Sequence, residues 1–468
     1  MLCGLNFWKP SAIMMKKLLL PFCIMLNACV PTTSQEPVSR ADMEITGAFV
    51  LNPFPVAPPT TLSVSNKDLA TDFLDLTFQL ETGKALPVFT RFEGPISVAI
   101  HGRIPAPLPA ELNRLINRLR SEADIDIFQT TSKTANINIH AISRQDIKST
   151  FPTAACFVAP NVTSLREFKR LRKTEVTSWS RQTTRSLVSI FLPSDAAPQE
   201  IRDCLHEEFA QSLAPLNDMY RLPNSVFNDD NIHTILTTFD TTVLKIAYAP
   251  ELRSGMTRQE VAARLPSLLS RLNPRGDQIP ARNAVPTSRA WNIAISQALG
   301  PGTAAQDRPS AARRAISLAR EANYNDHRLG FSYFAMGRVI QHNAPQTALD
   351  MFQIAHNIFV NAPKAELYAA HTATQLAAHN IAVGQGEKAL LILAPYLDVA
   401  YDNENASLLS TLMLLRAEAL ELTGHASEAR KVRLDSLTWA RYGFGSENYL
   451  RSKLREINAL NPLNRKNG

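Results

Sequence analysis

The chain has 468 residues, a length that exceeds one ordinary hydrophobic core and predicts two or three domains. Hydrophobic residues make up 45% of the sequence and charged residues 19%, a balance that indicates a globular protein and excludes a disordered one. The net charge of +7 is compatible either with binding to nucleic acid or with a position at an anionic envelope surface, and location decides between the two.

The N-terminus has the pattern of a secretion signal. The stretch MKKLLLPFCIMLNAC begins at Met15 with a positive segment and continues with an apolar run at 18–26 that is too short to span a bilayer. We therefore expect residues 1–28 to be a signal peptide, with Met14 or Met15 as the true start of translation.

The signal ends in LNAC, which resembles the lipobox of bacterial lipoproteins, proteins that are cleaved before the cysteine and lipidated on it. The resemblance implies that Cys29 anchors the chain in a membrane; an ordinary signal peptide with a chance cysteine is the alternative. Val30 follows, not the Asp that favours retention on the inner membrane, which implies an outer-membrane lipoprotein facing the periplasm. Nucleic acid is then not an expected partner, and the basic run at 166–173 is interpreted as a solvated face.

Two cysteines, Cys156 and Cys204, lie beyond the signal and its lipidation site. In an oxidising compartment such a pair suggests a disulfide that would tie a strand to a helix. Two buried free thiols are the alternative.

An α+β domain is predicted over residues 67–272, after a lipidated, proline-rich tether at 29–66. Alternating and helical hydrophobic patterns follow one another in the order strands, helix, strands, helix. The predicted strands are 74–80, 96–100, 125–129, 136–142, 155–159 and 186–192, and the predicted helices are 107–125, a helix from Pro198, 231–248 and 251–272.

The C-terminal part, residues 289–468, reads as helices joined by short turns, after a linker at 273–288. Small residues recur where a second helix begins after a turn: Ala315, Ala348, Ala389 and Ala429, at spacings of 33, 41 and 40 residues. This pattern is typical of a tetratricopeptide-like domain of three to four helical hairpins, which offers a surface to a protein or peptide partner. A non-repeating helical bundle is the alternative.

The stretch CLHEEFAQSLAPLND begins like the HExxH motif of a zinc peptidase and then departs from it. Four residues after His206 on a helix stands Ala210, which cannot bind a metal. We therefore interpret His206 as a surface histidine.

With the register shifted by one residue the stretch fits better. Glu207 and Gln211 then occupy the histidine positions, Glu208 occupies the glutamate position, and Asn217 stands at the third ligand position of a longer HExxHxxGxxH motif. The stretch thus resembles the active-site helix of a metzincin-type zincin in which every metal ligand is replaced, and the resemblance implies a zincin-like domain.

The same stretch, with SVFNDDN and YAPELRSGMT, resembles a family of proteobacterial predicted lipoproteins, domain-of-unknown-function family 2927. The resemblance covers about residues 70–260 and implies a location and a domain but no activity. The matching positions are Cys204, Glu207, Glu208, Gln211, Asn217 and Asp218, whereas Ala214-Pro215 replaces the family's glycine.

The chemistry of these side chains favours a site without metal or cofactor. Zinc prefers thiolate, imidazole and carboxylate ligands, and the neutral amides of Gln211 and Asn217 would hold it weakly. Glu207, Glu208, Gln211, Asn217 and Asp218 form either a structural polar network or a groove for a peptide or glycan, and Glu208 is the candidate catalytic residue.

The function predicted from sequence is a non-catalytic binding or assembly factor of the outer envelope. The alternative is a metallopeptidase-like or peptidoglycan-cleaving hydrolase that uses Glu208 with an unusual metal site.

Overall fold

The computed structural model describes residues 52–55, 60–132, 134–228, 230–282 and 285–465. The predicted signal peptide at 1–28 and the predicted lipidation site Cys29 lie outside these residues. None of the helices in the described part of the chain combines the length and the apolar character that crossing a bilayer requires.

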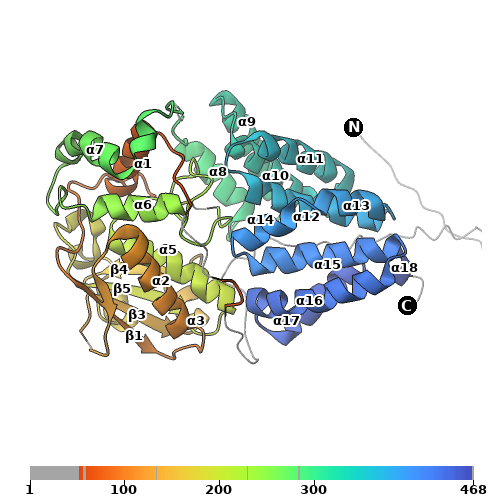
Figure 1. Ribbon diagram of the computed structural model, residues 1–468, viewed down its shortest axis with the longest axis horizontal. Helices are drawn as coiled ribbons and strands as arrows, with labels where there is room; N and C mark the ends of the chain where they lie inside the picture. The colour runs from red at the N-terminus through yellow and green to blue at the C-terminus, as the bar shows by residue number, and fades with distance from the viewer. Residues whose placement is uncertain (1–51, 56–59, 133, 229, 283–284, 466–468) are drawn as a thin grey trace, which may run out of the picture. The chain divides into compact units, whose positions relative to one another are not determined.

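The N-terminal region contains a five-stranded mixed sheet with the strand order β2-β1-β3-β5-β4 (Figure 1). Neighbouring strands run parallel, except that β4 pairs antiparallel with β5 and forms one edge of the sheet. The strands are β1 (Ile96–Gly102), β2 (Ile127–Gln129), β3 (Ile137–Ile142), β4 (Phe157–Pro160) and β5 (Val188–Pro193). The region is therefore α/β rather than the predicted α+β, because the parallel neighbours β1, β3 and β5 are far apart in sequence and their pairing leaves no local signal.

Two longer helices cover the sheet and position the site. Helix α2 (Leu108–Ala123) connects β1 to β2, and helix α5 (Pro198–Leu213) follows β5 and packs on β4, β5 and α2. Further helices are α1 (Asn66–Thr77), α3 (Arg144–Lys148), α4 (Leu165–Leu171), α6 (Thr238–Ala247) and α7 (Arg258–Leu272), with 3-10 turns η1 (Glu175–Thr177), η2 (Trp179–Arg181) and η3 (Pro274–Asp277).

The strand predicted at 74–80 is wrong, because residues up to Thr77 form the end of α1. Leu69, Phe73 and Leu76 recur at helical spacing and are buried, and this longer periodicity outweighs the short alternation that follows. The Ser65 side chain caps the helix by accepting a hydrogen bond from the Lys67 backbone N–H.

The helix predicted at 231–248 begins later, at Thr238. Thr237 and Asp240 form a capping box, in which each side chain bonds to the other's backbone N–H, so the chain enters the helix only there. Residues 231–237 remain irregular and pack against α5 and the helical region instead.

The C-terminal region is all α and is built from packed helix pairs. The pairs are α8 (Arg289–Leu299) with α9 (Arg308–Glu321), α10 (His327–Ile340) with α11 (Pro345–Asn361), α12 (Glu366–Ala382) with α13 (Gly386–Leu393), and α15 (Ala406–Leu422) with α16 (Ala426–Phe444). Helices α14 (Tyr396–Asp402), α17 (Glu447–Asn458) and α18 (Pro462–Arg465) complete it. Ala315, Ala348, Ala389 and Ala429 each lie on the second helix of a pair and are buried, as the repeat predicts.

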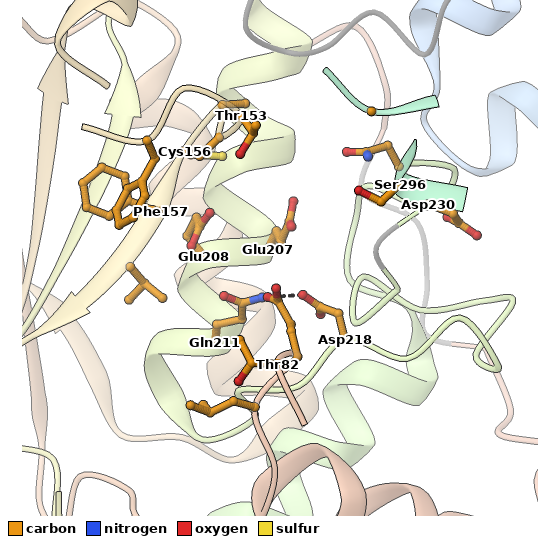
Figure 2. Close-up of a pocket in the computed structure, with 18 of the residues that line it drawn as sticks. Thr82, Thr153, Cys156, Phe157, Glu207, Glu208, Gln211, Asp218, Asp230 and Ser296 are labelled. Atoms are coloured by element: carbon orange, nitrogen blue, oxygen red, sulfur yellow. Dashed lines mark hydrogen bonds between the residues drawn. The ribbon is translucent and has the colours of Figure 1, made fainter. Parts of the chain in front are cut away.

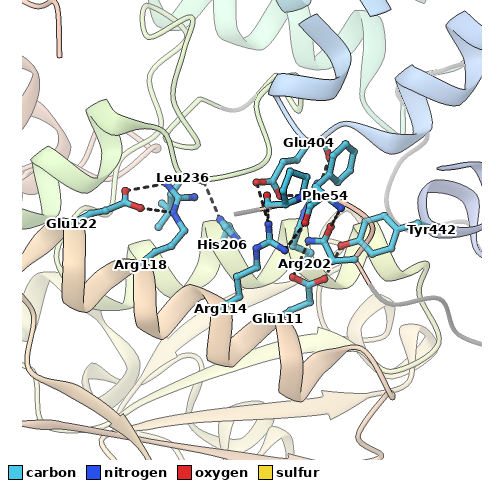
Figure 3. A network of polar contacts seen from close by, with 12 residues as sticks. Phe54, Glu111, Arg114, Arg118, Glu122, Arg202, His206, Leu236, Glu404 and Tyr442 are labelled. Carbon is cyan, nitrogen blue, oxygen red and sulfur yellow. Dashed lines mark hydrogen bonds and ion pairs between the residues drawn. The ribbon is translucent and has the colours of Figure 1, made fainter. Parts of the chain in front are cut away.

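A buried polar network joins the two regions at the first turns of α5 (Figure 3). The Arg202 guanidinium donates to Asp203 Oδ1 at 2.7 Å and to the Glu404 carbonyl oxygen at 2.8 Å. Nearby, the Tyr442 hydroxyl donates to Glu111 Oε1 at 2.8 Å. The sequence expected a tether at 29–66, but Phe54 within it is buried among the aromatic rings of this junction.

Close approach between paired helices depends on two glycines of α10. A Cβ built at Gly330 would lie 2.6 Å from Cε1 of Phe359, and one at Gly337 would lie 2.6 Å from Cε1 of Phe352. Both phenylalanines are buried on α11, so their rings have little room to move.

We predict that Gly337→Ala lowers the free energy of unfolding by about 1–3 kcal/mol, because the added methyl group overpacks this interface. In a helix without such a contact, replacing glycine by alanine raises the free energy of unfolding by up to about 1 kcal/mol. The sign of the change in free energy of unfolding is therefore informative by itself. Urea unfolding followed by circular dichroism measures it, with Gly94→Ala, where the new Cβ meets no atom within 4 Å, as the control. Unchanged or increased stability of the Gly337 variant would contradict the close approach.

Candidate functional site

A cleft of about 720 Å³ opens between β4, α5 and the first helix of the helical region (Figure 2). The 80–82 turn and the chain that leaves α5 close its remaining sides. Its lining includes Glu81, Thr82, Phe151, Cys156, Phe157, Val158, Trp179, Glu207, Glu208, Gln211, Leu216, Asp218, Asp230, Ile295, Ser296 and Phe331.

Helix α5 presents three of the predicted site residues to this cleft. Glu207, Glu208 and Gln211 share one face because a helix returns to the same side after about four residues. Glu208 and Gln211 are only 6% and 8% exposed, and Glu207 is the one residue of α5 that is not buried. The polar face that the sequence predicted is therefore the floor of an open cleft.

Asn217 and Asp218, which follow α5, point in different directions. Asp218 lines the cleft and accepts a hydrogen bond from Gln211 Nε2 at 3.0 Å. Asn217 turns the other way, because its Nδ2 donates to the Asp75 carbonyl oxygen at 3.0 Å and its backbone N–H to that of Leu76. Asn217 thus fixes the chain to α1 and is not part of the cleft lining.

A disulfide joins Cys156, immediately before β4, to Cys204 on α5, which confirms the predicted pairing over free thiols. The bridge connects one wall of the cleft to its floor across 48 residues of sequence. In the chain-entropy account a loop of this length stabilises the fold by about 4 kcal/mol. The separation between β4 and α5 is therefore fixed covalently.

His206 is not the predicted surface residue but is buried. Its Nδ1 accepts a hydrogen bond from the Leu236 backbone N–H at 3.0 Å, and burial among Arg118, Arg202 and Arg114 holds its pKa well below the usual range. The helical wheel missed this because residues 232–236 cover a face of α5 that looks polar in sequence.

Arg185 and Trp179 support the site, and sequence reasoning did not single them out. Arg185 is buried under the end of α5, where it donates at 2.6 Å to the carbonyl oxygens of Gln211 and Ala214. These bonds satisfy carbonyl oxygens at the end of the helix, which have no partner within it. Arg185 also lies 4.9 Å from the centre of the Trp179 ring, and this ring lines the cleft.

Residues 66–267 match the protein family described as "Protein of unknown function (DUF2927)". The chain carries a DUF2927 domain. No curated protein matches the chain. The matched residues contain the sheet, α5 and the disulfide, whereas the wall that α8 and Phe331 add to the cleft lies beyond the DUF2927 domain.

The lining of the cleft is strongly acidic. Carboxylates come from four separate parts of the DUF2927 domain: Glu81, the pair Glu207 and Glu208, Asp218, and Asp230. Within the described residues, the lining includes no lysine, arginine or histidine. Restricted hydration in the cleft raises the pKa of Glu81, although its side chain keeps an exposed surface. A hydrogen bond with the Asp218 side chain lowers this pKa, and repulsion from Glu207 raises it further.

Sequence reasoning missed Glu81 and Asp230 as site residues. Glu81 stands far from α5 in the sequence, and Asp230 lies in the SVFNDDN stretch, which the sequence did not connect with the face of α5. Asp230 accepts a hydrogen bond from the Tyr368 hydroxyl of α12. Burial raises the pKa of Asp230 to about 7. Only the packing of the helical region on the DUF2927 domain brings it to the cleft.

The side chains of the cleft do not fit a zinc ion. Three residues stand at the positions that zinc ligands occupy in the zincin motif. Of these, only Glu207 is a carboxylate, Gln211 is a neutral amide, and Asn217 points away from the cleft. Among the described residues no group of three histidine, cysteine or acidic side chains is placed to hold a metal ion.

Three buried histidines lie where the two regions meet behind the cleft. His327 Nε2 donates a hydrogen bond to the Tyr220 carbonyl oxygen. His233 lies close enough to His327 and His371 that a positive charge on either ring would oppose protonation of His233. Burial lowers the pKa of His233 to about 3 and the pKa values of the other two to about 4. The native protein therefore keeps these rings neutral, whereas the unfolded chain protonates them below about pH 6.5.

We predict that acid destabilises the protein through His233. Since its native pKa is lowered, its contribution to stability is complete above pH 6.5 and is lost as the pH falls toward 3. The free energy of unfolding of the wild type should fall relative to His233→Gln by about 2 kcal/mol between pH 7.5 and pH 5.

The quantity to follow is the difference in free energy of unfolding between the wild type and His233→Gln. The wild type alone would not suffice, because Asp230, whose native pKa is raised, changes stability in the opposite sense over pH 4 to 7. Urea titrations of both proteins at each pH provide the measurement. A difference that stays constant down to pH 5 would show that His233 is not held neutral by its surroundings.

Proposed function

We propose that the DUF2927 domain is a non-catalytic binding module that takes an extended peptide segment along β4. The observation that carries this proposal is that β4 is an edge strand whose outer side faces the cleft. A peptide that adds a strand to such an edge gains main-chain hydrogen bonds, while neighbouring pockets select its side chains.

The backbone of Val158 supports this mode of binding. Asn161 N–H donates to the Leu187 carbonyl oxygen, so Asn161, Ala159 and Phe157 are the residues that bond to β5 in the antiparallel ladder. The intervening Val158 therefore directs its N–H and C=O to the outer edge, and Val158 also lines the cleft. Pro160, which has no N–H, ends the usable edge.

A zincin-like scaffold fits this proposal. Two features resemble the zincin-like domain that the sequence suggested. They are the strand order with an antiparallel edge strand β4, and the helix after β5 that carries Glu208. The zinc positions are not equipped for the metal, which favours binding over hydrolysis.

For the C-terminal region we propose a tetratricopeptide-like surface for a protein or peptide partner. Repeated helix pairs with buried alanines support this reading, because small residues let paired helices approach closely and stack. The DUF2927 domain and this region would then act together as a binding or assembly factor of the outer envelope.

We further propose that the protein is a periplasm-facing outer-membrane lipoprotein anchored through Cys29. The LNAC motif and the apolar run before it support the anchor. The Cys156–Cys204 disulfide fits an oxidising compartment.

Peptide binding is tested with a library of capped, unstructured octapeptides added to the full mature chain. We expect some members to change the fluorescence of Trp179 in a saturable manner, and Val158→Pro to abolish the change because it removes the outward N–H while sparing the bonds to β5. Val158→Thr keeps that N–H and is the matched control, and Trp179→Phe identifies the signal.

No saturable binding by any peptide would refute the proposal. Cleavage of a peptide that Glu208→Gln abolishes would show a hydrolase instead, and mass spectrometry of the same mixtures detects it.

Lipidation is tested by growing bacteria that express the protein with an alkyne-bearing fatty acid. We expect the label on the wild type and not on Cys29→Ser. The unlabelled variant should also leave the membrane fraction on washing, since the lipid is the proposed anchor. A labelled Cys29→Ser protein, or an unlabelled wild type, would refute the anchor.

A further inference from the structure

We infer that the peptide bound in the cleft places a lysine or arginine side chain among Glu81, Glu207, Glu208 and Asp218. This inference rests on the proposed function, because it specifies the occupant of the edge of β4. It would give the DUF2927 domain a preference for basic segments.

Charge complementarity is the first argument. The whole chain has a net charge of +7, yet the lining that the structure describes is acidic and includes no basic side chain. Arg185, which lies over the Trp179 ring that lines the cleft, donates to the carbonyl oxygens at the end of α5 and is committed there. A negative cleft in a basic protein selects cationic occupants and disfavours anionic ones.

The shape of the cleft is the second argument. Glu207, Glu208 and Gln211 project from α5 beside the edge of β4, so a side chain of a peptide paired with Val158 can reach them (Figure 2). Apolar groups surround the acidic floor: Phe151, Phe157, Trp179, Leu216, Ile295 and Phe331. Lysine and arginine suit such surroundings, because their methylene stems pack on apolar surface while their charged ends meet carboxylates or an aromatic face.

The helical region completes the cleft. Ile295 and Ser296 of α8, together with Phe331 of α10, form the wall opposite α5. The exposed Ser296 allows a direct test of where a peptide binds, since Ser296→Trp would add bulk to this wall and narrow the space between α8 and α5.

The experiment uses two capped octapeptides of alternating valine and threonine that differ at one central position, lysine in one and the uncharged norleucine in the other. Calorimetry with the full mature chain at low salt should show the lysine peptide binding on the order of tenfold more tightly, which corresponds to about 1.4 kcal/mol. In high salt this ratio should shrink, since screening weakens exposed charge pairs.

Two variants locate the preference. Glu207→Gln should reduce the ratio, whereas Glu428→Gln, which removes an exposed carboxylate paired with Arg416 in the helical region, should leave it intact. Ser296→Trp should weaken both peptides. Circular dichroism of each variant verifies that it is folded.

The outcomes separate the two proposals. Equal binding of the lysine and norleucine peptides would overturn the charge preference and leave the peptide cleft standing. Tighter binding of lysine that Glu207→Gln does not alter would place the cation elsewhere and also overturn the inference. Failure of both peptides, with the octapeptide library negative as well, would overturn the proposed function itself.

Discussion

Helix α5 is the element on which the cleft and the junction between the two regions both depend. Fifteen of its sixteen residues are buried, so it is packed on nearly all sides. The disulfide at Cys204 ties it to β4, Arg202 joins it to Glu404 of the helical region, and Arg185 holds its final carbonyls. A helix fixed in this way can hold two adjacent carboxylates toward a cleft, because its position does not have to respond to their repulsion.

Holding several carboxylates in one poorly hydrated cleft costs folding free energy. Burial raises the pKa values of Glu81 and Asp230, and for Glu81 repulsion from Glu207 adds to this effect. Stability must come from elsewhere in the molecule, from the covalent bridge and from two extended hydrophobic cores.

Much of the fold could be predicted from local patterns. All five strands, the helices at 107–125 and from Pro198, and the alanine-marked helix pairs lie where the hydrophobic periodicity places them. The errors arose where short patterns compete or where distant residues decide. At 74–80 a brief alternation concealed the end of a helix, and at 231–237 a capping box delayed the start of one. The prediction that His206 is exposed was wrong, because the helical spacing of one segment cannot show that another segment packs on its polar face.

By itself the sequence determined which residues of α5 face the cleft, because helical spacing is a local property that puts Glu207, Glu208 and Gln211 together. It also limited a disulfide to one possible pair, since only two cysteines follow residue 29, and the structure showed that this pair is bonded. Only the tertiary structure decided that Asn217 leaves the site, and that Glu81, Asp230 and the α8 wall join it. Asn217 and Glu81 are placed by contacts within the DUF2927 domain, whereas Asp230 and the α8 wall depend on the packing of the helical region on that domain. Contacts between segments so far apart in the chain leave no periodicity or spacing to read.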